Sequence, residues 1–153
     1  MKGLDTTNLE KFLKALKNRP RARVGILGDK AGRSESVANN ATIGAYHEFG
    51  TTKMPQRSFL RMPISEKLNE KLKNSGAFDK DVLAEVVSRG TIVPWLKLVA
   101  ITAESIVLEA FGSGGFGKWP QWSEKYKSKT GSLLVDTTQL RESITHDVKE
   151  RSA

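Results

Sequence analysis

The chain has 153 residues, of which 38% are hydrophobic, and this length suits one compact domain with its own core. It contains no cysteine, which excludes disulfides, thiolate zinc sites and cysteine nucleophiles. The net charge of +8 comes entirely from residues 1–76, which favours contact with phosphate or an acidic partner, although a basic face kept for solubility explains it equally well.

A helix is predicted at the start of the chain. Thr7–Glu10 has the form of a capping box, and apolar residues follow it at helical spacing. Asn18 and Pro20 end the pattern. The apolar stripe consists of Leu9, Phe12, Leu13 and Leu16.

A strand and a loop are predicted next. Arg21–Leu27 contains β-branched residues in loose alternation, which predicts a strand with Val24 and Ile26 facing inward. The turn-forming and polar residues of about 28–40 predict a flexible loop. A helix is then predicted from about Ala41 to Phe49, ended by Gly50. An extended arm follows through Pro55, Phe59 and Pro63. Two further helices are predicted, from about Ile64 to Lys73 and at Asp79–Arg89.

Pro94–Phe111 predicts the core helix, because proline is tolerated in a first turn and nine apolar residues fill one continuous sector. The opposite face carries charged residues but also Leu98, Ile101 and Leu108. Three apolar residues on a polar face indicate a second contact, within the chain or with a neighbouring subunit. The sector contains Trp95, Leu96, Val99, Ala100, Ala103, Ile106, Val107, Ala110 and Phe111.

The glycine-rich stretch at about 112–118 is predicted to be a flexible loop. Gly112–Gly117 matches G-x-G-x-x-G, but a helix precedes it and Lys118-Trp119-Pro120 follows, so the strand–turn–helix context of a nucleotide site is missing. The remaining predictions are a basic helix at Ser123–Lys129, a turn at Gly131, a capped turn at Asp136–Arg141 and a strand at Ser143–Val148.

No motif predicts catalysis, a metal or a cofactor. His47 and His146 each stand beside a carboxylate, but sequence neighbours point in different directions and do not make a chelate. We interpret both as ordinary surface or interface histidines. No serine lies in a nucleophile-elbow pattern, and we therefore expect a protein that is not an enzyme.

The predicted elements indicate a single α+β domain over residues 1–153, with a small, mainly antiparallel sheet packed against a long helix. Membrane insertion and secretion are not predicted. Met1–Asp5 lacks the apolar core of a signal peptide, and the most apolar stretch, Thr91–Ile101, is too short to span a bilayer. We expect a soluble protein made in the cytoplasm.

Two stretches carry separate motifs, Asn40–Arg61 (NATIGAYHEFGTTKMPQRSFLR) and Lys118–Ile144 (KWPQWSEKYKSKTGSLLVDTTQLRESI). Together they resemble the tail-completion and virion-morphogenesis (neck) proteins of long-tailed bacteriophages. In those proteins an E-F-G-like helix end leads to P-x-R-x-F-L-R, and a W-x-P-L-S-like passage precedes L-x-D-T-G-x-L-R-x-S-I. Matching positions are Glu48, Phe49, Gly50, Pro55, Arg57, Phe59, Leu60, Arg61, Trp119, Ser123, Lys129, Leu134, Asp136, Thr137, Leu140, Arg141, Ser143 and Ile144.

The chain departs from that pattern at three positions. Ser58 stands where a second proline is usual, Trp122 replaces a leucine-like residue, and Thr138 replaces the common glycine after Asp-Thr. A β-branched residue at positive φ would be strained. We therefore expect helix-like φ and ψ at Thr138, with Asp136 or Thr137 as the N-cap of the turn that follows.

The resemblance implies a structural ring, six subunits being the expected number, around the DNA channel at the head–tail joint of the virion. Its expected partners are further copies of the chain, a head-side adaptor or head-closure protein, and a tail terminator or tail tube protein, with non-specific DNA contact in the channel. Two alternatives to a neck protein stay open. The first is a non-catalytic nucleic-acid-binding accessory protein, which the basic N-terminal half suits. The second is a hydrolase, but the sequence shows no catalytic constellation for one.

The residue types in the motifs favour architectural roles. Gly50 permits a left-handed helix end, and Pro55 stiffens the arm. Phe59 and Leu60 are expected to anchor that arm in an apolar groove. Arg57 and Arg61 are expected to form forked bonds to carboxylates or carbonyls, within the chain or across a subunit boundary. Each of these residues could equally close the core of the monomer. We expect Leu98, Ile101, Leu108 and the Pro55–Arg61 arm to pack beyond the main core.

Overall fold

A computed structural model describes residues 6–32, 39–121, 123 and 138–150. Helices dominate these residues, and two strands form a small antiparallel sheet. The α+β prediction is confirmed. The elements are α1 (Thr7–Lys17), β1 (Arg21–Ile26), the 3₁₀ helix η1 (Gly28–Ala31), α2 (Asn40–Phe49), α3 (Arg61–Asn74), α4 (Lys80–Arg89), α5 (Val93–Ser113), α6 (Gln139–Glu142) and β2 (Ile144–Lys149).

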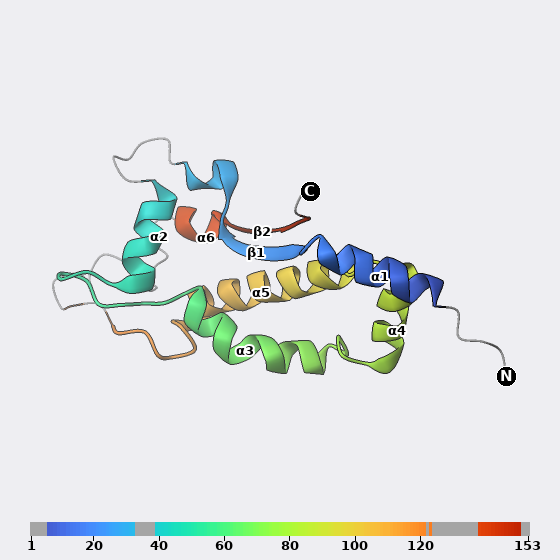
Figure 1. The fold of residues 1–153 in the computed structure, drawn as a ribbon. Helices are drawn as coiled ribbons and strands as arrows, with labels where there is room; N and C mark the ends of the chain where they lie inside the picture. The colour runs from blue at the N-terminus through green and yellow to red at the C-terminus, as the bar shows by residue number, and fades with distance from the viewer. Residues whose placement is uncertain (1–5, 33–38, 122, 124–137, 151–153) are drawn as a thin grey trace.

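The sheet and α3 both pack against the long α5 (Figure 1). β1 and β2 pair from Arg21 opposite Lys149 to Ile26 opposite Ile144. Val24 and Ile26 pack against the core, as predicted. Helices α1 and α4 lie together at one end of α5, whereas α2 and α6 lie at the other end (Figure 1).

Helix α5 supplies most of the core, as its apolar sector predicts. Six residues of that sector are buried, and Trp95, Leu96 and Val99 are half-buried. Pro94 lies in the first turn, where its missing N–H costs no helical hydrogen bond. The helix ends at Gly114 in the left-handed conformation, with φ of 61°. The six buried residues are Ala100, Ala103, Ile106, Val107, Ala110 and Phe111.

The predicted start of α3 at Ile64 is wrong, because the helix begins at Arg61. Pro63 is the third residue of this helix and is buried. The first turn of a helix has amides without intrahelical acceptors, so a proline there interrupts nothing. The predicted helix at Asp79–Arg89 is confirmed as α4, with Asp79 at its N-cap and Gly90 left-handed at its end.

Other predicted boundaries need small corrections. Helix α1 begins at Thr7, so Thr6 rather than Thr7 is the N-cap, and the Thr6 side chain makes no capping bond. The second strand begins at Ile144, because Ser143 caps α6 and donates its hydroxyl to the Leu140 carbonyl at 2.6 Å. The predicted helix at 123–129 and the turn at Gly131 lie largely or wholly outside the described residues.

The two predicted loops contain ordered backbone in their described parts. Gly28–Ala31 forms η1, and Asn40 Nδ2 donates to the carbonyls of Lys30 and Gly32 at 3.2 and 3.0 Å. Gly112 lies inside α5, and the turns after it close through backbone bonds such as Trp119 N to Gly114 O at 3.0 Å. These glycines therefore make a tight turn that carries Trp119 back to the core, and a helix precedes it, unlike in a nucleotide-binding loop.

Within the described ranges, no helix combines the length and apolar character needed to cross a lipid bilayer.

Candidate functional site

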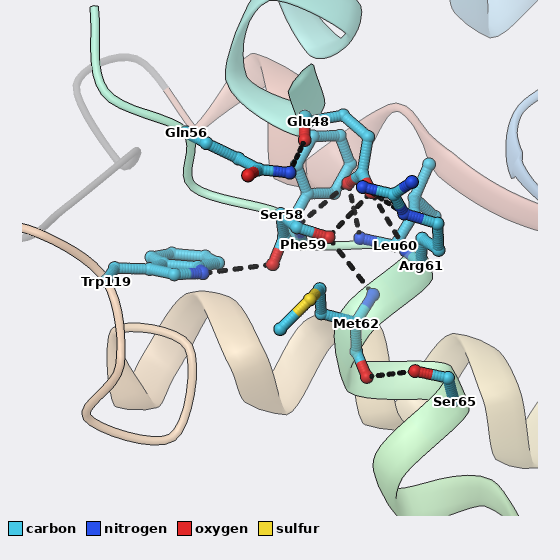
Figure 2. Close-up of polar contacts among 9 residues, drawn as sticks. All are labelled: Glu48, Gln56, Ser58, Phe59, Leu60, Arg61, Met62, Ser65 and Trp119. Atoms are coloured by element: carbon cyan, nitrogen blue, oxygen red, sulfur yellow. Dashed lines mark hydrogen bonds and ion pairs between the residues drawn. The ribbon is translucent and has the colours of Figure 1, made fainter. Parts of the chain in front are cut away.

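The carboxylate of Glu48, at the end of α2, is the centre of a buried hydrogen-bond network (Figure 2). Its Oε2 accepts from the backbone N–H groups of Phe59 and Leu60, both at 2.9 Å. Its Oε1 accepts from the Ser58 hydroxyl at 2.6 Å and from Arg61 N at 3.1 Å. Four hydrogen bonds and the positive end of the α3 dipole therefore stabilise one buried charge. Glu48 caps a helix that begins thirteen residues later in the chain.

Two further side chains support this cap. The Ser58 hydroxyl, while donating to Glu48, accepts from Met62 N at 3.0 Å (Figure 2). Gln56 Nε2 donates to the Glu48 carbonyl at 3.0 Å. In the sequence, Ser58 is notable only because the resembling proteins usually have proline at this position. In the structure, the Ser58 hydroxyl forms two hydrogen bonds that proline cannot form. The residue pattern alone does not reveal that Ser58 supports the start of α3.

Arg57 joins the first motif to the second. Its side chain is buried, and its Nε and Nη2 donate to the carbonyls of Pro120 and Gln121 at 2.9 and 3.1 Å. In the opposite direction, Trp119 Nε1 of the second motif donates a hydrogen bond to the Ser58 carbonyl of the first at 3.0 Å (Figure 2). The expected forked bonding of Arg57 to carbonyls is thus present, and it lies within the chain. Burial lowers the pKa of the Arg57 guanidinium from its usual value.

Apolar residues of both motifs form one core cluster. The rings of Phe59 and Phe111 lie 5.1 Å apart, and Trp119 meets Phe111 edge-on at 5.9 Å. Leu140 and Ile144 complete the buried cluster with Val107 and Ala110. Phe59 anchors the Pro55–Arg61 arm in the core of its own chain. Pro55 itself is exposed, and Gly50 ends α2 with φ of 74°.

Thr138 contradicts the expectation of helix-like backbone angles. Its φ is 57° and its ψ is −21°, and it is itself the N-cap residue of α6. Its hydroxyl donates to Glu142 Oε1 at 2.7 Å, one turn later. The predicted caps Asp136 and Thr137 lie outside the described residues. Of the other motif residues in α6, Leu140 is buried and Arg141 is exposed.

The two histidines have different surroundings. His47 is half-buried, and its Nδ1 has no hydrogen-bond partner within the described part of the chain. Burial, with the Arg57 charge as a second cause, lowers the pKa of His47 to about 4. His146 Nδ1 contacts Glu104 Oε2 and links β2 to α5. Among the described residues, no three metal-ligating side chains gather as a metal site would require.

The three apolar residues on the outer face of α5 differ in burial. Leu108 packs against the core cluster, and Leu98 is half-buried beside Val82 and Val86 of α4. Leu108 therefore packs within the chain, as one of the two predicted outcomes allows, whereas Leu98 lines an open hollow between α4 and α5. Ile101 is 53% exposed.

Within the described part of the chain, apolar side chains are exposed on α1 and around a groove between α2 and α3. The α1 face consists of Leu9, Leu13 and Leu16, which are 44%, 51% and 37% exposed. The α2–α3 groove is an open hollow of about 570 Å³ with Phe49, 66% exposed, in its wall. Arg61 lies over the Phe49 ring at 5.5 Å. The rest of the groove is lined mainly by Ile26, Ala41, Gly44, Ala45, Phe59, Leu60 and Ile64.

Comparison with protein-family models, curated proteins and solved structures found no match to this chain.

Proposed function

We propose that this chain is a structural subunit that builds a ring at the head–tail joint of a long-tailed phage, between a head-side adaptor or closure ring and the tail terminator or tube. The observation that carries the proposal is the pair of apolar surfaces that the described residues leave exposed. Helix α1, which carries the α1 face, and helix α2, which lines the α2–α3 groove, lie toward opposite ends of α5 (Figure 1). A monomer exposes both to water, whereas association of identical chains buries both at once.

The geometry favours head-to-tail association. An amphipathic helix laid in an apolar groove is a common recognition mode, with anchors at helical spacing. Leu9, Leu13 and Leu16 provide such anchors, and Phe49 and Ile64 offer an apolar wall. Since the two surfaces differ, each chain gives α1 to one neighbour and takes α1 from the other. Such heterologous contacts generate rings when the rotation closes.

The motif residues support the link to neck proteins. Residues from both motifs share one core, and Arg57 and Trp119 fasten the motifs to each other. Thr138 has the positive φ that glycine adopts most easily, at a position where the resembling proteins carry glycine. The sequence resemblance therefore falls on residues that depend on one another physically.

Complementary charge variants test the ring contact. Leu13→Asp removes the α1 face, and Phe49→Asp removes the groove wall. Each variant alone should be monomeric by mass photometry under conditions where the wild-type chain associates. A mixture of the two should form heterodimers that grow no further, because Leu13→Asp keeps its groove and Phe49→Asp keeps its α1 face.

Matched controls are available on the same helices. Lys14→Asp changes the exposed basic side of α1, and Tyr46→Asp changes an α2 residue that is 49% exposed and does not line the groove. Both should associate like wild type. Equal loss of association in all four variants would contradict the specific contact.

The neck assignment needs a separate test in infected cells. Loss of the chain should yield DNA-filled heads and finished tails that remain unjoined, as seen by electron microscopy. Joined particles in its absence would contradict the assignment even if the purified chain formed rings.

A further inference from the structure

Four cationic side chains gather where β1 begins and β2 ends. Arg21 and Arg23 are exposed on β1, whereas the intervening residues turn inward. Together with Arg19, Lys149 and Glu150 they line one hollow, and none of its described lining residues is apolar or aromatic. We call these residues, Arg19, Arg21, Arg23 and Lys149, the basic strand face.

The pairing across the sheet leaves part of this charge unbalanced. Arg23 lies opposite Asp147 and donates to it through Nε at 2.7 Å. Arg21 lies opposite Lys149. Like charges directly opposite each other destabilise a sheet. Within the described ranges, neither Arg21 nor Lys149 forms an ion pair.

Arg19 adds a second local conflict. It follows the end of α1 with φ of 45°, and its N–H bonds to the Leu16 carbonyl at 3.0 Å. Glycine is the usual residue at this left-handed position after a helix, and a residue with a Cβ costs stability there. Placing arginine at this point gains a cation at the expense of backbone strain. Such conflicts between local preference and structure are typical of functional positions.

We propose that the basic strand face binds the phosphate backbone of nucleic acid. Alternate residues on a strand are about 6.6 Å apart, so Arg21 and Arg23 present two neighbouring cations, and Arg19 lines the same hollow. Guanidinium groups match phosphate geometry with paired bonds. Protein interfaces instead have an apolar centre, which this hollow lacks. A phosphate between Arg21 and Lys149 would remove their mutual repulsion. The site needs only one chain and does not depend on the ring.

The test measures binding of a fluorescent random-sequence DNA duplex to the full chain across about 50–200 mM salt. Arg21→Gln and Lys149→Gln should each weaken binding about three- to tenfold, and the slope of log K against log salt should lose about 0.9 for each phosphate contact removed. Lys53→Gln and Lys80→Gln make the same charge change elsewhere and should leave the slope near that of wild type.

Arg19→Gly gives a second, opposed readout. It should weaken DNA binding while the Tm stays level or rises by about 2–4 °C, because glycine relieves the positive φ. Equal slopes for the face variants and the two lysine controls would overturn the proposal, since charge alone would then explain binding. Tighter binding of poly-glutamate than of DNA would also overturn it and indicate an acidic protein partner.

The same samples examined by mass photometry separate this site from the ring. A monomer that binds DNA with the predicted variant pattern would support the site and count against the ring as the binding form. A ring whose DNA affinity is unchanged by substitution of Arg21 or Lys149 would count against the site and support the ring as the binding form.

Discussion

The indole Nε1 of Trp119 donates a 3.0 Å hydrogen bond to the Ser58 carbonyl, sixty-one residues away in sequence. Both residues are buried, at 6% exposure each, so neither group has water as an alternative partner. The contact closes the turn after α5 onto the segment that enters α3. It places the ring of Trp119 against Phe111, and it is one of the bonds that make two distant motifs a single structure.

Trp119→Phe is expected to lower the free energy of unfolding by about 2 kcal/mol, because the buried Ser58 carbonyl loses its partner and a small cavity forms. Urea denaturation measures the loss. Trp95→Phe is the matched control: its indole donates to the Ala77 carbonyl at 2.9 Å, but Trp95 is only half-buried. If Trp95→Phe lowered the free energy of unfolding as much as Trp119→Phe, the special role of the Trp119 hydrogen bond would be contradicted.

Glu48→Gln is expected to cost about 2–4 kcal/mol of stability. The amide keeps one acceptor oxygen, but its N–H₂ group replaces the other, and the backbone N–H groups that bonded to the replaced oxygen then lack acceptors. Glu109→Gln removes a carboxylate from an exposed pair with Lys71 and should cost about 0.5 kcal/mol or less. Similar denaturation midpoints for the two variants would show that Glu48 does not hold the helix start.

Thr138→Gly is expected to raise stability by about 0.5–1 kcal/mol. Relief of the positive φ outweighs the lost hydroxyl bond to Glu142 and the greater freedom of the unfolded chain. The thermal midpoint should rise accordingly. Thr42→Gly, in the first turn of α2, should lower it, since glycine has a lower helix propensity than threonine. A fall at both positions would mean that the Thr138 hydroxyl matters more than its backbone strain.

Periodicity predicted the parts of the fold that depend on local rules. The apolar sector of α5 follows from helical spacing, and Gly50 and Gly90 end their helices because both adopt positive φ. The start of α3 escaped prediction, because its first turn depends on the carboxylate of Glu48 on another helix. No pattern within residues 58–64 reveals that partner.

The candidate surfaces were predictable only in part. The leucine stripe of α1 indicates a helix with an apolar side, but spacing does not tell whether the partner is the same chain. Leu108 packs against the core, Leu98 is half-buried at the wall of a hollow, and Ile101 stays exposed. The positive φ of Thr138 could not be derived from a residue type that avoids it. Only the three-dimensional structure brings Arg21 opposite Lys149.

The half-buried His47 gives the stability a defined pH dependence. Its pKa is lowered to about 4 in the folded chain, whereas an unfolded histidine titrates near 6.5. Between these values the unfolded chain binds the proton and the folded chain does not. The contribution of His47 to the free energy of unfolding is therefore fully present above pH 6.5 and is lost as the pH drops toward 4. Below that range both states are protonated and the contribution is constant. Burial and the nearby Arg57 charge, in that order, cause the shift.

His47→Gln should therefore flatten the curve of unfolding free energy against pH over this range. The difference between wild type and variant should change by at most about 3.5 kcal/mol between pH 6.5 and 4, since one pKa unit corresponds to about 1.4 kcal/mol. Urea titrations at half-unit pH steps measure both curves. The carboxylates titrate in both proteins, so the difference isolates His47. Parallel curves across the interval would contradict a half-buried His47 that stays neutral in the folded chain.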